Sequence, residues 1–273
     1  MDGSIVRVLL LRTAGTNCDR ELAVAFRTAG ASVDVLHINQ LLADPGKLTE
    51  YQIFAIPGGF SYGDDIASGK ILANQIVHHL GVPLRQWIAD GKLIIGICNG
   101  FQVLVKAGLL PGPMPQLAPE DLFSTTLTHN SHARFEDRWV RLLSCSNICK
   151  WIQPGKPLYL PIAHGEGRFV VRDQNVLQAL KQNDQIVFRY VDSQAHPAKE
   201  FPDNPNGSVD SIAGICDVSG RVLGLMPHPE RFSDSLQHPF WDRYPSSPVP
   251  DGLQLFQNAV QFVRSQMCVT ISA

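Results

Sequence analysis

Charge of either sign is scarce in this sequence. Only 18% of the 273 residues are charged, and the 23 basic and 25 acidic side chains leave a formal net charge of −2. A nucleic-acid-binding protein needs a concentrated basic patch, so we expect no nucleic-acid partner. Apolar residues make up 44% of the chain, which is enough for a sizeable core.

Long hydrophobic runs are absent as well. The longest apolar stretches, such as residues 8–11 and 93–97, have the length of single strands, whereas a membrane-spanning helix needs about 20 apolar residues. We therefore expect no membrane association. The opening segment MDGSIVRVLLLR runs directly into an expected strand, without the basic region, long apolar core and cleavage site of a signal peptide. These features predict a cytoplasmic protein.

Two familiar motifs are missing. The six cysteines, at positions 18, 98, 145, 149, 216 and 268, form no Cys-x-x-Cys pair and have no matching cysteine or histidine pair at zinc-ligand spacing, so we expect no structural metal site. No GxxxxGK sequence followed by Ser or Thr occurs, which argues against ATP binding by a phosphate loop in this chain.

The first 110 residues alternate strand and helix patterns. Apolar strands are expected at residues 5–11, 32–37, 53–56 and 93–97, and helical spacing is found at residues 21–29, 67–80, 84–89 and 101–107. This alternation is typical of an α/β fold with a central, mostly parallel sheet that is flanked by helices on both faces.

The pattern changes after about residue 111. Short strand candidates at residues 139–143, 168–171, 186–190, 212–216 and 222–225 are separated by turn-rich segments, which indicates additional antiparallel or mixed strands in the second half. The residues 217–220 between two apolar runs favour a hairpin. Residues 193–206 resemble a loop, residues 233–251 an irregular excursion, and residues 253–263 a C-terminal helix. We expect one domain over residues 1–273.

One cysteine stands apart because of its surroundings. The segment Gly96-Ile97-Cys98-Asn99-Gly100 lies between an expected strand and an expected helix, which is the arrangement of a nucleophile elbow. Such a sharp turn forces the central residue into strained backbone space, and glycines on either side leave room for it. The thiol would also lie at a helix N-terminus, which favours the thiolate. The alternative is a buried structural cysteine at a strand end.

A thiol nucleophile needs a base and a group that orients the base. His228 and Glu230 follow the expected strand at residues 222–225, and Pro229 favours an extended backbone at His228. Residues i and i+2 of an extended segment point the same way, so we expect Glu230 to orient His228. The alternative is a proline-rich strand exit with an ordinary surface histidine and glutamate.

The pair Gly58-Gly59 follows the expected strand at residues 53–56. Glycines let backbone N–H groups approach a ligand closely, so the N–H groups of Gly59 and Asn99 are candidates for an oxyanion hole. A plain turn after the strand is the alternative.

These residues resemble a known family, the class I (triad) glutamine amidotransferases. Within it, five motifs resemble the glutaminase subunits of phosphoribosylformylglycinamidine synthase: GTNCD at residues 15–19, PGGFSYGD at 57–64, GICNGFQ at 96–102, AHGEGRF at 163–169 and MPHPER at 226–231. The resemblance runs from about residue 7 to residue 231 and implies a flavodoxin-like glutamine amidotransferase type 1 domain. Other members of the class usually have Leu-Gly-His-Gln after the cysteine, where this chain has Asn-Gly-Phe-Gln.

The resemblance implies a role for each matching residue. Cys98 would attack the glutamine carboxamide, His228 would shuttle the proton and Glu230 would orient His228, with the oxyanion at Gly59 and Asn99. Substrate contacts are implied for Gly58, Gln102, Ser131, Arg134 and Phe135, and residues 164–168 are expected near a synthetase interface.

The implied activity is hydrolysis of L-glutamine to L-glutamate and ammonia. The ammonia would pass to a separate large synthetase subunit, which uses ATP and magnesium to convert formylglycinamide ribonucleotide to the amidine. A small third subunit would bridge the complex. This chain itself would need no cofactor.

Two departures from the family pattern affect this interpretation. Thr13-Ala14 stands where Phe-Pro is usual, and extra length is expected around residues 110–122, 193–206 and 233–251. Other possibilities are a different amidotransferase of the class, a cysteine peptidase or thiol-stress protein on the same scaffold, and a non-catalytic regulatory module with a decayed site.

Overall fold

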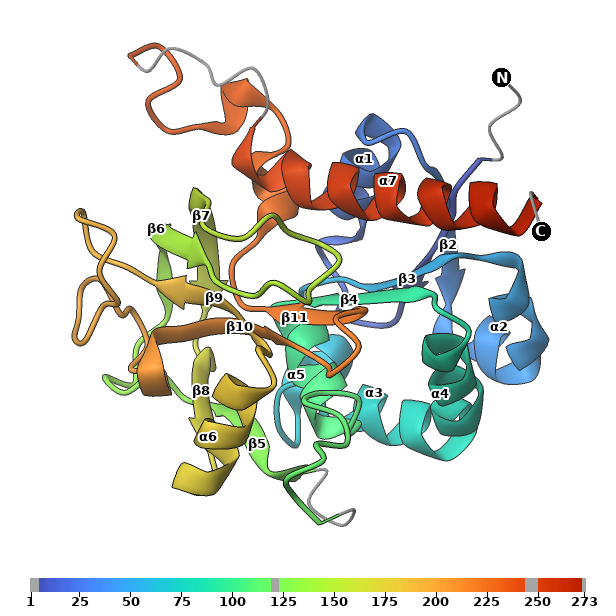
Figure 1. Cartoon of the computed structure of the whole chain (residues 1–273), viewed down its shortest axis with the longest axis horizontal. Coiled ribbons are helices and arrows are strands. Elements are labelled where there is room, and N and C mark those ends of the chain that lie inside the picture. Colours follow the sequence, from blue (N-terminus) through green and yellow to red (C-terminus); the bar gives the residue numbers. More distant parts are fainter. Residues whose placement is uncertain (1–4, 119–122, 244–249, 272–273) are drawn as a thin grey trace.

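A nine-stranded sheet runs through the molecule (Figure 1). The computed structural model describes residues 5–118, 123–243 and 250–271. The strand order is β2-β1-β3-β4-β11-β10-β9-β6-β7. The five strands from β2 to β11 are mutually parallel, and the four that follow are antiparallel to their neighbours. The predicted α/β class, with a mostly parallel first half and antiparallel strands in the second, is confirmed.

The parallel strands agree closely with the sequence pattern. They are β1 (Arg7–Arg12), β2 (Ser32–His37), β3 (Ile53–Ile56), β4 (Leu93–Ile97) and β11 (Val222–Leu225). All residues of β3, β4 and β11 are buried, because helices cover the sheet on both faces.

Helices lie above and below the sheet in Figure 1. On one side are α1 (Asp19–Thr28) and α7 (Asp251–Ile271), joined by an edge-to-face contact of Phe26 with Phe256 at 4.8 Å between ring centroids. On the other are α3 (Lys70–Gln75), α4 (Gly81–Ala89) and α5 (Asn99–Lys106). A π-helical turn at Ile76–Leu80 connects α3 to α4, so the helical character expected at residues 67–80 is found from Lys70 onward.

The antiparallel half contains β10 (Ile212–Cys216), β9 (Ile186–Tyr190), β6 (Glu136–Ser144) and β7 (Pro157–His164). The predicted hairpin at residues 217–220 joins β10 to β11, which pair in antiparallel fashion. A separate two-stranded sheet is formed by β5 (Thr125–Thr128) and β8 (Arg168–Val171).

Four elements were not anticipated from the sequence: α2 (Ile38–Ala43), α6 (Gln174–Gln182), β5 and β7. β7 contains Pro157 and Pro161. Proline cannot donate to a strand ladder and is tolerated at an edge, and β7 is the outermost strand of the large sheet. Because of these prolines, the sequence pattern did not predict β7, a strand that carries part of the site.

The predicted irregular segments are only partly described. Residues 193–206 contain no helix or strand, as expected. Of the excursion at residues 233–251, the part at 244–249 lies outside the described residues, as do residues 119–122 of the expected extra length at 110–122. The C-terminal helix predicted at residues 253–263 extends from Asp251 to Ile271. No helix in the described ranges is both long and apolar enough to cross a membrane.

The contact of α5 with β3 leaves no room for a side chain at Gly100. A Cβ atom there would lie 2.0 Å from the carbonyl oxygen of Ile56. We expect Gly100→Ala to lower the free energy of unfolding by about 1–3 kcal/mol, as overpacking does. Urea unfolding measures this change. Gly46→Ala is the control, because a Cβ atom there meets only the flexible carboxylate of Asp44; an unchanged midpoint for Gly100→Ala would contradict the tight contact.

Candidate active site

Cys98 lies at the turn between β4 and α5 and has the strained backbone that the flanking glycines predict. Its φ is 52° and its ψ is −106°. A Cβ atom at Gly96 would lie 2.4 Å from the carbonyl oxygen of Gly100, so the two glycines are required for the turn itself. The thiol is 7% exposed and its Sγ lies 3.8 Å from the carbonyl oxygen of Ala163.

His228 reaches Cys98 because β11 pairs with β4. The two strands are parallel, with Leu225 opposite Ile97, and the N–H of Cys98 donates to the carbonyl oxygen of Leu225 at 2.8 Å. The chain leaving β11 therefore passes beside the elbow. The N–H of His228 donates to the carbonyl oxygen of Pro161 at 2.8 Å, which fixes this segment against β7.

His228 and Glu230 form a buried pair, but not through the extended backbone that the sequence suggested. His228 Nδ1 lies 2.7 Å from Glu230 Oε1, and the two residues are 1% and 0% exposed. Pro229–Phe232 is a 3-10 helix, so the i, i+2 face argument was wrong for this segment. The tight turn after His228 brings the carboxylate back to the imidazole.

The charges around His228 favour its protonated form. Burial by itself lowers the pKa of His228, but the charge of Glu230, the charge of Cys98 and the side chain of Cys18 outweigh it, so the pKa is raised well above its ordinary value. An imidazolium beside a thiol stabilises the thiolate. His228 Nε2 has no hydrogen-bond partner among the described residues.

Gly58 packs closely against the side chains of His228, Cys18 and Cys98. A Cβ atom there would be 2.9 Å from His228 Cε1 and 3.5 Å from Cys98 Cβ. Glycine is therefore the residue that lets the loop after β3 approach both side chains. Gly59 has a φ of +135°, and a Cβ atom on it would lie 2.6 Å from the carbonyl oxygen of Gly15.

The two predicted oxyanion donors border the same region. Gly59 lines the cavity in front of Cys98. Asn99 is the first residue of α5, whose N–H has no partner within the helix ladder. The Asn99 side chain also accepts from the N–H of Ser61 at 3.2 Å and donates to Asp64 and to Gln102 at 3.1 and 3.0 Å. It thereby joins the glycine loop to the helix behind the nucleophile.

A cavity of about 230 Å³ opens in front of Cys98. It is lined by residues from six segments of the chain: Asn17, Cys18, Gly59, Phe60, Asp64, Ser68, Cys98, Gln102, Phe135, Asp137, Ala163, His164, Gly165, Glu166, His228 and Arg231. Its size suits an amino acid. A larger cavity of about 790 Å³ lies beside β6, β7 and the segment at residues 232–241, but none of the predicted site residues lines it.

The other predicted substrate contacts fall into two groups. Gln102 and Phe135 line the cavity, although the Gln102 amide already accepts from Asn99 and donates to the carbonyl oxygen of Glu166 at 2.7 Å. Ser131 and Arg134 are exposed and do not line it. The N–H of Ser131 donates to the carbonyl oxygen of Asn206 at 3.0 Å, and that of Arg134 to His132 Nδ1 at 3.2 Å.

Sequence reasoning missed a second cysteine in the site. Cys18 Sγ lies 3.9 Å from His228 Nδ1 and 3.1 Å from Arg231 Nη2. The sequence contained an indication of this position, because Cys18 lies in residues 15–19, which follow β1. Since β1 is parallel to β3 and next to it in the sheet, the segments after these two strands lie side by side. His164 and Glu166 were missed as cavity residues because β7 was not recognised. Asp137 was missed because the predicted strand began at residue 139, whereas β6 begins at Glu136.

Cys18, His228 and Glu230 place ligand atoms within 4.8 Å of one another, and these residue types can bind a metal ion. The surrounding contacts oppose this use. His228 Nδ1 is already paired with Glu230, and the guanidinium of Arg231 places a positive charge against Cys18 Sγ.

Comparison with known proteins agrees with this geometry. Residues 5–263 match the family model described as the CobB/CobQ-like glutamine amidotransferase domain. The subunit PurQ of phosphoribosylformylglycinamidine synthase from Dehalococcoides mccartyi is 45% identical over 262 residues, covering 96% of this chain and 99% of the relative. The chain belongs to the PurQ family of glutamine amidotransferases. PurQ of Methanococcus maripaludis is 43% identical over 94% of this chain and 97% of its own length.

Solved structures share the fold of this chain. The structure of PurLQS from Thermotoga maritima matches with a TM-score of 0.70 and 31% identity, covering 95% of this chain and 99% of that one. A glutamine amido transferase from Methylobacillus flagellatus, at 16% identity and a TM-score of 0.50 over 96% of this chain and 94% of that one, shares the fold. Because the Dehalococcoides relative aligns over nearly its whole length, the extra length expected here is not peculiar to this chain.

The raised pKa of His228 depends on Glu230. Burial opposes the shift, and Glu230 is the largest contribution that raises the pKa, so we expect Glu230→Gln to lower it. NMR titration of the His228 ring protons measures the change. Glu21→Gln is the control, because Glu21 reaches the site only through Arg231, at 3.6 Å. An unaltered titration in Glu230→Gln would show that the carboxylate does not set the charge of the imidazole.

Proposed function

We propose that this chain hydrolyses L-glutamine to L-glutamate and ammonia through a thioester on Cys98. The observation that carries the proposal is the buried His228–Glu230 pair, 2.7 Å apart, beside a cysteine held at a φ of 52° on a strand-to-helix turn. A nucleophile, a base and a group that orients the base are the three parts of a catalytic triad.

The chemistry follows from the positions of these groups. The Cys98 thiolate attacks the carboxamide carbon, and the N–H groups of Gly59 and Asn99 bind the oxyanion. The C–N bond then breaks as imidazolium His228 gives its proton to the departing ammonia. Water attacks the thioester while His228 accepts a proton, the C–S bond breaks, and glutamate leaves with Cys98 restored.

Substrate binding is assigned to the cavity in front of Cys98. Gly58 lies beside the Cβ of Cys98, and Gly59, Gln102 and Phe135 line the cavity. Ser131 and Arg134 lie outside the lining residues and act on the loop that carries Phe135 rather than on glutamine directly.

The ammonia is passed to a separate synthetase. The relatives are named as subunits of phosphoribosylformylglycinamidine synthase, which supports conversion of formylglycinamide ribonucleotide to the amidine, in de novo purine biosynthesis, as the receiving reaction. The large synthetase subunit uses ATP and magnesium, whereas this chain uses no cofactor. A cytoplasmic location and a small subunit that bridges the complex complete the proposal.

A glutamine analogue with an electrophile in place of the carboxamide tests the nucleophile. We expect it to modify Cys98 alone, as mapped by mass spectrometry of peptides, and to leave Cys98→Ala unlabelled. Cys18→Ser is the matched control, since Cys18 lines the same cavity, and it should retain the label at Cys98. Label at any other cysteine, or a peptidase activity untouched by the analogue, would refute the assignment.

The second test concerns coupling to the synthetase. We expect the isolated chain to release ammonia from glutamine slowly, because uncoupled release would be wasteful, and the rate to rise by about tenfold or more when the synthetase and its substrates are added. Glutamate formation measures the rate. Equal rates with and without the synthetase would contradict the coupling, and the labelling result would be unaffected.

A further inference from the structure

We propose that Asn130 is a positioning residue that joins two segments of the cavity wall and thereby sets the affinity for glutamine. This inference rests on the proposed glutaminase function. Asn130 lies after β5, is 2% exposed and does not line the cavity itself. Its effect is exerted through the residues it holds.

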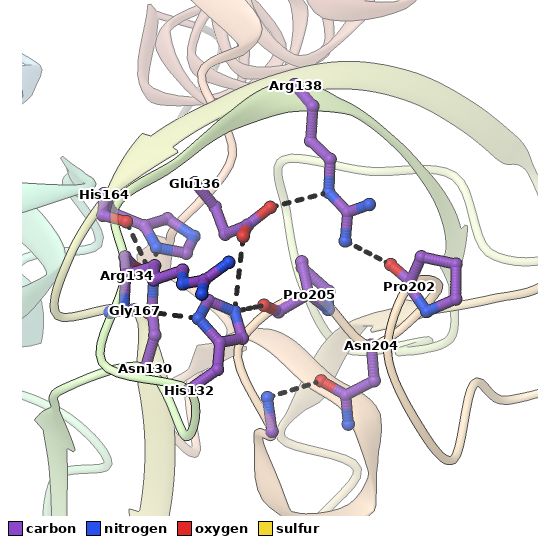
Figure 2. Close-up of polar contacts among 11 residues, drawn as sticks. Asn130, His132, Arg134, Glu136, Arg138, His164, Gly167, Pro202, Asn204 and Pro205 are labelled. Carbon is purple, nitrogen blue, oxygen red and sulfur yellow. Dashed lines mark hydrogen bonds and ion pairs between the residues drawn. The ribbon is translucent and has the colours of Figure 1, made fainter.

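The Asn130 side chain uses all of its hydrogen-bonding capacity (Figure 2). Nδ2 donates to the carbonyl oxygens of Arg134 and His164 at 2.8 and 2.9 Å. Oδ1 accepts from the N–H of Gly167 at 3.0 Å and lies 3.2 Å from His164 Nδ1. The backbone adds a bond from its N–H to the carbonyl oxygen of Gly165 at 2.9 Å.

These bonds connect two parts of the wall that are separate in sequence. One is the segment from Asn130 into β6, which carries Phe135 and Asp137. The other is the end of β7 with the turn after it, which carries Ala163, His164, Gly165 and Glu166. Gln102 of α5 holds the same turn by donating to the carbonyl oxygen of Glu166. Asn130 thus connects these two segments through its side chain.

An amide is the group that this position requires. The N–H of Gly167 is a donor, so the amide atom that faces it must be the oxygen, Oδ1. The carbonyl oxygens of Arg134 and His164 are acceptors, so the amide group that faces them must be the NH2 group of Nδ2. His164 Nδ1 must then carry a hydrogen to face Oδ1. Burial and the charge of His228 lower the pKa of His164 to about 3, so the ring stays neutral while it makes this bond.

A third loop supports the same segment from outside. His132 Nε2 lies 2.9 Å from the carbonyl oxygen of Pro205, and the Arg138 guanidinium contacts the carbonyl oxygen of Pro202 and Glu136 (Figure 2). Asn204 of this loop is also buried, at 4% exposure, and bonds only within it: Nδ2 donates to Ser208 and Oδ1 accepts from Gly207 and Ser208. These hydrogen bonds of Asn204 reach neither segment of the wall, so it is a matched asparagine for comparison.

The test compares Asn130→Ala and Asn130→Asp with Asn204→Ala in the full chain reconstituted with its synthetase. Asn130→Asp keeps the size of the side chain but turns an oxygen toward two carbonyl oxygens. For both Asn130 variants we expect KM for glutamine to rise by about tenfold or more while kcat changes less than about threefold. Asn204→Ala should lose a similar amount of stability in urea and keep the KM of the parent protein.

A second measurement separates substrate positioning from damage to the nucleophile. Alkylation of Cys98 by iodoacetamide, which needs no glutamine-binding wall, should keep its rate in the Asn130 variants, whereas the glutamine-mimicking electrophile should need higher concentrations. An unchanged KM, a fall in kcat alone, or failure of both variants to fold would overturn the positioning role. A parent protein that does not hydrolyse glutamine would instead refute the proposed function.

Discussion

The approach of α5 to the sheet is the constraint on which the site depends. Gly96 and Gly100 let the helix backbone come so close to β3 and β4 that the turn between strand and helix contains a single strained residue. That residue is Cys98. The elbow fixes both the nucleophile and the N–H of Asn99 beside it, so the local strain is part of what organises the chemistry.

Strand pairing supplies the rest of the triad. β11 is far from β4 in sequence but lies next to it in the sheet, in parallel register, and so His228 emerges beside the elbow. In an open α/β sheet, functional loops gather at the carboxyl ends of the strands. The loops after β1, β3, β4 and β11 do so here, and they contribute Cys18, Gly59, Cys98 and His228 to one cavity.

The parts that could be predicted from sequence are those with a local cause. The apolar runs of the parallel strands, the glycines around Cys98 and the hairpin before β11 each leave a pattern within a few residues. β7 has no such local pattern, because Pro157 and Pro161 are typical of loops. Proline is tolerated in a strand at the edge of a sheet, and the position of β7 at the edge follows only from the whole fold. The turn after β7 was therefore expected near an interface and not in the cavity wall. The positioning role of Asn130 left no local pattern either, because its partners His164 and Gly167 lie more than 30 residues away.

Two histidines that line this cavity are both buried but differ in the direction of their pKa shifts, because their neighbouring groups differ. His228 and His164 are 1% and 3% exposed, and burial alone lowers the pKa of both. The Nδ1 of His228 faces the carboxylate of Glu230, and its pKa is raised. The Nδ1 of His164 faces the amide oxygen of Asn130, and its pKa is lowered. A carboxylate stabilises an imidazolium, whereas a neutral amide does not offset desolvation and the repulsion from His228. The cavity thus holds one imidazole that can be charged beside the thiol and one that stays neutral within the wall, and the difference rests on the carboxylate of Glu230.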